Sequence, residues 1–140
     1  MTADAESGAP ESAWGDSFFY YDPEDQASDR MMPFATIVAS NYAGFDEASD
    51  LDRPGIYRLN VAVGRTAYIA LLGHSPDEHA GLAGEFDYTV LDRLIPHPVY
   101  ASQGWVSILN PGERTGAQAQ ELITAARELA GKRHDRRSSL

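Results

Sequence analysis

The sequence contains no cysteine among its 140 residues. This absence excludes disulfides, thiolate metal sites and cysteine nucleophiles. No apolar run approaches the roughly 18 residues that a membrane-spanning helix needs. The first stretch, MTADAESGAPESAWGD, also lacks the basic-then-apolar order of a signal peptide. We therefore expect a cytoplasmic protein without a membrane segment.

Basic residues are scarce in the first part of the chain. Residues 1–52 hold twelve acidic side chains and a single basic one, Arg30, and the net charge of the whole chain is −10. A negative field repels phosphate backbones, which argues against nucleic acid as a partner. The basic stretch GKRHDRRSSL at residues 131–140 leaves a weak polyanion contact as the least favoured alternative.

The fingerprints of several enzyme classes are also missing. The sequence has no G-x-G-x-x-G and no G-x-x-x-x-G-K, the glycine-rich loops that cradle dinucleotides and nucleotide phosphates. It has no G-x-S-x-G, the turn that presents a serine nucleophile. We therefore expect no nucleotide cofactor and no serine hydrolase.

Four stretches have the composition of β-strands: SFFYY (17–21), PFATIVAS (33–40), IYRLNVAV (56–63) and GWVSIL (104–109). Alternation is clearest in 56–63, where Leu59 and Val61 share one face and Arg58 and Asn60 share the other. Pro54-Gly55, before this strand, suits a type II turn. The pattern predicts one apolar sheet face and one face that presents a guanidinium and an amide.

Helical patterns lie between and after the last two strands. Residues 65–72 end at Gly73, a helix-ending glycine, and Ser75, Pro76 and Glu78 form a capping box for a short helix. Residues 87–95 suit either a short helix or a pair of turns. Apolar residues at helical spacing predict a helix over 116–131, which Gly131 would end.

The order of these elements predicts an α+β domain, a two-layer sandwich with an antiparallel sheet of about four strands and helices on one face. We divide the chain into a disordered acidic segment (1–13), a single domain (14–131) and a flexible basic tail (132–140). Helices on one face would leave the other open to a ligand or a partner.

Arg58 and Asn60 are the first candidate ligand-binding pair. Side chains two apart on a strand lie about 7 Å apart on one face, and arginine offers a planar donor fork for carboxylate or phosphate. The alternative is an ion pair with Asp16, Asp50 or Asp52, because the chain has more acidic than basic side chains.

His97 lies between Pro96 and Pro98, in LIPHPVYASQGW. The prolines restrict the backbone and would fix the direction of the imidazole, as a general base needs, with Tyr100 as its partner. The alternative is a structural turn in which His97 bonds the backbone. His97 and Tyr100 are the catalytic candidates, and whether the site is catalytic stays open.

Aromatic side chains are the other candidate lining of a cleft. Most must belong to the core, but alternation places some on the face opposite the helices, where Trp105 would stack on a ligand. The aromatic residues considered are Trp14, Phe18, Phe19, Tyr20, Tyr21, Tyr57 and Trp105.

Metal binding has weak support. His74 and His79 are five residues apart rather than the four that place two ligands on one helix face. The acidic stretch at 46–52 lacks the ligand order of an EF-hand. We expect a solvated loop there and no metal site.

The motif order W-G-D-x-F-F-Y-Y, P-F-A-T-I-V, L-D-R-P-G-x-x-R-x-N and H-P-x-Y-x-x-x-G-W resembles an uncharacterised actinobacterial domain-of-unknown-function family, from about Trp14 to the last helix. More distantly, GWVSIL followed by an amphipathic helix is similar to MmcQ/YjbR-like proteins. The resemblance implies a compact α+β fold with an open sheet face, and it implies no particular reaction.

Three hypotheses follow for function. In the first, the open face binds a small polar or anionic molecule, as a binding protein or accessory enzyme, through Arg58, Asn60, His97, Tyr100 and Trp105. In the second, the same face pairs two copies in a non-catalytic homodimeric module. The third is nucleic-acid binding through the tail. A concave pocket around Arg58, Asn60 and His97 would favour the first hypothesis, and a flat apolar face the second.

Overall fold

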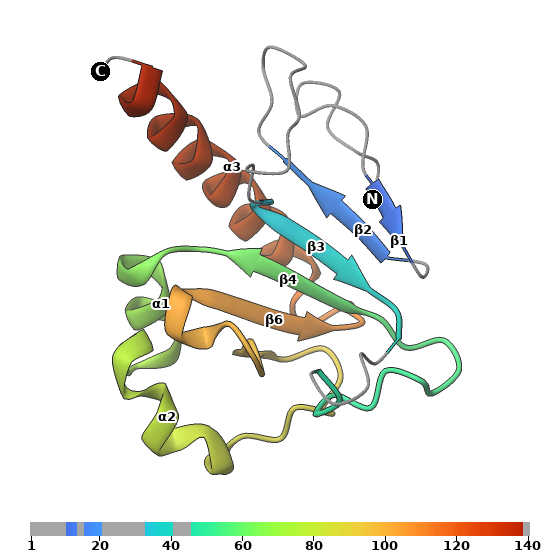
Figure 1. The fold of residues 1–140 in the computed structure, drawn as a ribbon. Helices are drawn as coiled ribbons and strands as arrows, with labels where there is room; N and C mark the ends of the chain where they lie inside the picture. Colours follow the sequence, from blue (N-terminus) through green and yellow to red (C-terminus); the bar gives the residue numbers. More distant parts are fainter. Residues whose placement is uncertain (1–10, 14–15, 21–32, 41–45, 139–140) are drawn as a thin grey trace.

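A computed structural model describes residues 11–13, 16–20, 33–40 and 46–138, and within them six strands form one open sheet. Every neighbouring pair is antiparallel, in the order β1-β2-β3-β4-β6-β5 (Figure 1). The strands are β1 (Glu11–Ala13), β2 (Asp16–Phe19), β3 (Ala35–Val38), β4 (Arg58–Ala62), β5 (Leu94–Pro96) and β6 (Trp105–Leu109). The antiparallel sheet and the mixed α/β composition predicted from the sequence are confirmed.

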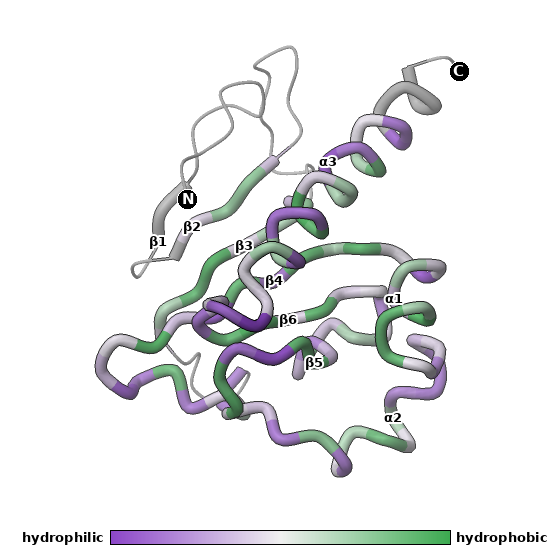
Figure 2. The backbone as a smooth tube through the Cα atoms, turned by 180° about the vertical axis from the view of Figure 1, so that it is seen from behind, coloured by the Kyte–Doolittle hydropathy of each residue, from purple (hydrophilic) through white to green (hydrophobic). Residues whose placement is uncertain are grey.

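The α-helices are α1 (Arg65–Leu72), α2 (His79–Leu82) and α3 (Gly116–Ser138), and short 3-10 turns are η2 (Pro76–Glu78), η3 (Ala83–Glu85) and η4 (Ala101–Gln103). Helix α3 lies across one face of the sheet, in front of it in the view of Figure 2. Helix α1 follows the end of β4, and α2 lies below α1 in the view of Figure 1.

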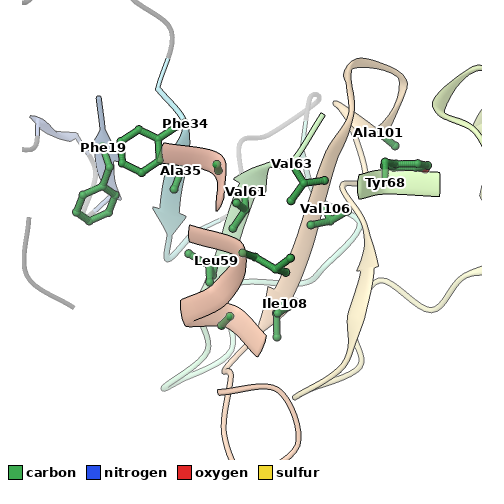
Figure 3. Packing of buried hydrophobic residues seen from close by; sticks show 13 residues of the cluster. Phe19, Phe34, Ala35, Leu59, Val61, Val63, Tyr68, Ala101, Val106 and Ile108 are labelled. Atoms are coloured by element: carbon green, nitrogen blue, oxygen red, sulfur yellow. The ribbon is translucent and has the colours of Figure 1, made fainter. Parts of the chain in front are cut away.

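The main core lies between the sheet and α3. Leu59 and Val61 of β4 and Val106 and Ile108 of β6 point to this side, as the alternation of β4 predicts (Figure 3). From α3, Ala119, Leu122 and Ala126 pack against them. A buried side chain of the Leu, Ile or Val class contributes about 1.5–3 kcal/mol through removal from water, so this layer supplies the main driving force for folding.

Several turns and helix ends lie where short sequence motifs predict them. Gly55 has φ 75° and the Ile56 amide donates to the Arg53 carbonyl at 3.3 Å, which confirms the turn at Pro54-Gly55. Helix α1 has the predicted bounds, and Gly73 ends it at φ 80°. The amide of Ser75 donates to Glu78 Oε1 at 2.8 Å, so the capping box is formed.

The structure differs from several predictions at the ends and edges of elements. Of the two alternatives for residues 87–95, the turns and not the helix are formed; β5, a strand of three residues that pairs with β6, follows them and was not predicted. Helix α3 continues through Gly131 to Ser138, because a single helical glycine costs only about 1 kcal/mol and Lys132 and Arg133 are good helix formers. Of the segment 1–13 predicted to be disordered, residues 11–13 form a strand paired with β2, and residues 1–10 lie outside the described residues.

The face opposite α3 is less open than expected. Segment 46–56 folds over it, so that Leu51 packs with Val38, Ile95 and Leu109 in a second small core. Asp46 and Ser49 of this acidic segment are buried, whereas Glu47, Asp50 and Asp52 are exposed. The prediction of a solvated loop is therefore wrong for Asp46 and right for the other three acids. The part of this face left uncovered forms a cavity.

Candidate functional site

A cavity of about 450 Å³ opens on the sheet face that carries Arg58 and Asn60. All five residues proposed from the sequence as ligand-binding line it, together with residues from other strands and loops. The lining residues are Phe18, Pro33, Thr36, Val38, Asp46, Arg58, Asn60, His97, Tyr100, Gln103 and Trp105.

Strand register explains why these side chains meet. Residues directly opposite each other in neighbouring strands point to the same face. Asn60 of β4 is paired with Thr36 of β3 and with Ser107 of β6, which puts three polar side chains in one row. Phe18 lies opposite Thr36 in β2 and continues the row to an aromatic wall.

Arg58 is fully buried, with no exposed side-chain surface, and it is paired with Asp46. The guanidinium donates from Nη1 to Asp46 Oδ1 at 3.0 Å and from Nη2 to Oδ2 at 2.5 Å. Nη1 also donates to Ser49 Oγ at 3.1 Å. The ion-pair alternative therefore describes Arg58, although the partner is Asp46 rather than Asp50 or Asp52; the side chain of Asp16 lies outside the described residues.

The side chain of Asn60 is hydrogen-bonded to its own strand and to both neighbouring strands. Its Oδ1 accepts from Arg58 Nε and from Ser107 Oγ, both at 2.7 Å. Because Nε of arginine only donates, this bond fixes which end of the amide is oxygen. The amide nitrogen then donates to Thr36 Oγ1 at 2.9 Å. The polar row is thus one connected network, from the ion pair to a threonine hydroxyl on the cavity wall.

His97 follows β5 directly and is 4% exposed. Its Nδ1 accepts from the backbone amides of Val99 and Tyr100, at 2.9 and 3.0 Å. Backbone amides only donate, so Nδ1 carries no proton and the neutral ring carries its proton on Nε2. Burial, followed by the charge of Arg58, lowers the pKa of His97 to about 3.

These contacts fit the structural role weighed from the sequence and argue against the general base. The imidazole closes the turn after Pro96 through Nδ1, as the structural alternative proposes. Nε2–H makes no hydrogen bond within the described part of the chain, and His97 lines the cavity. A ring with this tautomer and this low pKa presents a donor to the cavity, whereas a general base would need an unprotonated nitrogen there.

Tyr100 and Trp105 frame His97. The ring centroid of His97 lies 5.1 Å from that of Tyr100 and 6.1 Å from that of Trp105, the latter nearly perpendicular at 77°. Trp105 is buried in β6, and Tyr100 is 38% exposed at the start of η4. One aromatic wall is therefore fixed in the sheet and the other lies at the rim.

A protein-family model matches nearly the whole chain. The model described as "Family of unknown function (DUF6194)" matches residues 2–139. The chain belongs to this family. No curated protein and no solved structure matches the chain. The actinobacterial origin and the MmcQ/YjbR resemblance expected from the sequence stay predictions.

In this DUF6194 chain, Phe18 was among the aromatics considered for a cleft, and the sequence did not single out five other cavity residues: Pro33, Thr36, Val38, Asp46 and Gln103. Thr36 and Val38 were recognisable in principle, since both belong to a predicted strand whose alternation assigns them a face. Gln103 has no sequence signal, because it is an exposed residue of η4. Asp46 is one of four acids in a short stretch, and nothing local distinguishes it from the other three.

The other residues considered for metal binding lie elsewhere. His74 and His79 are buried beside α1 and α2, with ring centroids 6.1 Å apart and planes at 23°. His74 Nε2 lies 2.9 Å from the Tyr68 hydroxyl. No group of three or more His, Cys, Asp or Glu side chains in the described residues is arranged to hold a metal ion.

Of the other aromatics, Phe19 is in the main core and Tyr57 is exposed, while Trp14 and Tyr21 lie outside the described residues. In the described part of the chain, no helix is both long and apolar enough to cross a membrane.

Proposed function

We propose that this DUF6194 protein binds a small molecule in the cavity beside Asn60. The observation that carries the proposal is the convergence of Arg58, Asn60, His97, Tyr100 and Trp105, from three separate segments, on one concave site. A volume of about 450 Å³ lies within the range of about 300–1,000 Å³ typical of small-molecule sites. Apolar and aromatic walls with a few buried polar groups are also typical of such sites.

The side-chain chemistry supports binding more than catalysis. Arg58 is occupied by Asp46, and His97 presents a protonated nitrogen to the cavity. Neither group is poised as a base or nucleophile at neutral pH. We therefore propose a binding protein, with His97 as a donor, Trp105 and Tyr100 as aromatic walls and Arg58 and Asn60 as the base of the site.

Homodimerisation through the same face is the competing hypothesis, and the concave shape of the site favours a ligand instead. The cytoplasmic location and the absence of nucleic-acid binding expected from the sequence stay predictions.

The test uses a pair of substitutions at one exposed rim position. Gln103→Trp would place a large ring over the cavity mouth, whereas Gln103→Ala leaves the mouth open, and neither alters the core. A fragment library is screened against the full chain by saturation-transfer NMR, and the hits are titrated into both variants. We expect hits to bind the wild type and Gln103→Ala and to lose at least tenfold in affinity for Gln103→Trp.

Equal affinity for Gln103→Trp and Gln103→Ala would show that the hits bind elsewhere and would overturn the proposal. A library without hits, together with a concentration-dependent dimer broken by Gln103→Trp in sedimentation, would favour the homodimeric module.

A further inference from the structure

The charges at the base of the cavity cancel each other. Asp46 and Arg58 form a bidentate pair, and both side chains are at least 93% buried, because their exposed fractions are 0% for Arg58 and 7% for Asp46. The donors of the guanidinium are directed to Asp46, Ser49 and Asn60. The charge of Arg58 is therefore neutralised by Asp46, and its donors are already hydrogen-bonded, so an anionic ligand gains little from it. A cationic ligand gains little from Asp46 for the same reason.

A charged ligand gains little here and loses its hydration. Moving an ionised group out of water costs several kcal/mol unless a partner compensates it. The walls of the cavity are mostly apolar, with Phe18, Pro33, Val38 and Trp105 among them. The site therefore favours a ligand without net charge.

The buried polar groups left for a ligand are donors. His97 Nε2–H has no partner among the described residues, and its tautomer is fixed by the two backbone amides at Nδ1. Thr36 Oγ1 accepts from Asn60, which leaves the hydroxyl hydrogen of Thr36 to be donated elsewhere. Both residues line the cavity. The complementary ligand group is an acceptor, such as a carbonyl oxygen.

We infer that the cavity selects an uncharged, partly aromatic molecule whose carbonyl-type acceptor bonds His97 Nε2–H. This inference rests on the proposed function and narrows it, because it replaces the anionic ligand considered from the sequence with a neutral acceptor. In this inference the Asp46–Arg58 pair forms the floor of the cavity and does not bind the ligand.

The experiment uses probes that differ in charge and not in shape. Triples of carboxamide, carboxylate and amidinium are prepared on phenyl, indole and naphthalene rings. Affinities for the full chain are measured by NMR titration of the backbone amides and of the His97 imidazole nitrogens. We expect the carboxamide to bind at least tenfold more tightly than both charged members, with a shift of His97 Nε2.

Two substitutions at His97 separate its two nitrogens. In His97→Asn the side-chain oxygen takes the place of Nδ1 and accepts the turn amides, but the donor is lost. In His97→Gln the amide nitrogen takes the place of Nε2. We expect carboxamide affinity to fall at least fivefold in His97→Asn and to be largely retained in His97→Gln.

If the Asp46→Asn variant folds, its preference among the three probes gives a second test. The charge of Arg58 is then uncompensated, so the preference should move from carboxamide to carboxylate. Where it does not fold, the wild-type triples and the His97 variants decide the inference.

The outcomes distinguish the inference from the function on which it rests. A carboxylate or amidinium that binds the wild type as tightly as its carboxamide overturns the neutral-acceptor inference and leaves the small-molecule site in place. Carboxamide binding unchanged in His97→Asn overturns the role of Nε2. If no member of any triple binds and the fragment library also gives no hits, both the inference and the proposed function fail.

Discussion

The guanidinium of Arg58 and the carboxylate of Asp46 form a two-point ion pair across twelve residues of sequence, with Nη1 and Oδ1 3.0 Å apart. This pair joins the acidic segment 46–56 to β4 and so holds the segment over the sheet face. A second ion pair of the same chain, Arg65–Asp77 at 2.6 Å, lies on the surface with side chains 59% and 74% exposed. The two pairs allow a direct comparison of buried and exposed charge.

Removal of one partner of the buried pair should be strongly destabilising. Asp46→Asn leaves the charge of Arg58 buried without compensation, which costs about 3–5 kcal/mol. Asp77→Asn, the matched change in the exposed pair, should cost less than about 1 kcal/mol. Urea unfolding followed by tryptophan fluorescence measures both differences.

The double variant Asp46→Asn/Arg58→Met extends this test, because it removes both charges. It should be more stable than the sum of the two single losses predicts, since the penalty for an unpaired charge disappears. Similar losses in Asp46→Asn and Asp77→Asn would contradict the buried position of the pair.

The stability of the fold should depend on pH through His97. Burial lowers the pKa of His97 to about 3 in the folded state, whereas the unfolded chain has an ordinary value of about 6.5. Below pH 6.5 the unfolded state therefore binds the extra proton, and the free energy of unfolding falls as pH decreases, by about 1 kcal/mol per pH unit. The contribution of His97 is fully present above pH 6.5 and is lost between pH 6.5 and 3.

Urea unfolding at pH 7.5, 6.5, 5.5 and 5.0 measures this slope above the range where most carboxylates titrate. His79, whose pKa is lowered first by burial and then by His74, contributes in the same direction. His97→Asn should therefore reduce the slope without abolishing it. An unchanged slope in this variant, or an imidazole NMR signal of His97 that titrates near pH 6.5, would refute the assignment.

Gly104 holds two backbones close together at the site. It has φ 83°, and its carbonyl accepts from the amides of Val63 and Gly64 at 3.1 and 3.2 Å. A Cβ at Gly104 would lie 3.1 Å from the Gly64 carbonyl carbon. Gly73 has a similar φ of 80° but nothing within 4 Å of such a Cβ.

Gly73→Ala should thus lower the free energy of unfolding by only about 1–2 kcal/mol, the cost of placing an alanine in the left-handed conformation. Gly104→Ala should cost about 1–3 kcal/mol more, because one backbone must shift. Thermal unfolding of the two variants measures the difference. Since Gly104 precedes Trp105, any ligand affinity should also fall in Gly104→Ala and not in Gly73→Ala. Equal melting temperatures for the two variants would argue against the close approach.

Asp92 fixes the start of α3 from a distance of more than twenty residues. Its carboxylate accepts from the amides of Gly112, Arg114 and Thr115, each at 2.9 Å, and from Thr115 Oγ1 at 2.6 Å. These bonds, led by that of the Thr115 hydroxyl, lower the pKa of Asp92 to about 2. Asp92 also has φ 54°, which asparagine tolerates better than alanine.

Asp92→Ala should therefore lower the melting temperature more than Asp92→Asn, since asparagine keeps one acceptor oxygen and the backbone conformation. Because the folded pKa is depressed, the contribution of Asp92 is present above about pH 4 and is lost as pH falls towards 2. Differential scanning calorimetry at pH 7 and pH 3 measures both effects. A larger loss for asparagine than for alanine would contradict this account of the α3 start.

Most of the predicted fold came from local patterns. The alternation around Leu59 assigned both faces of β4 correctly, because the period of a strand is fixed by backbone geometry. Gly55, Gly73 and the Ser75–Glu78 capping box were recognisable since each forms within a few residues. Strand β5 was missed because it is three residues long and contains a proline, so it has no detectable period.

By itself, the sequence determined which side chains share a face, where two helices begin, and that no thiol chemistry is available. Only the tertiary structure decided which of four neighbouring acids pairs with Arg58, and that the ring of His97 keeps its proton on Nε2. The reason is physical: side-chain direction follows from the local backbone, whereas the partners and the protonation of a buried polar group depend on segments that only folding brings together.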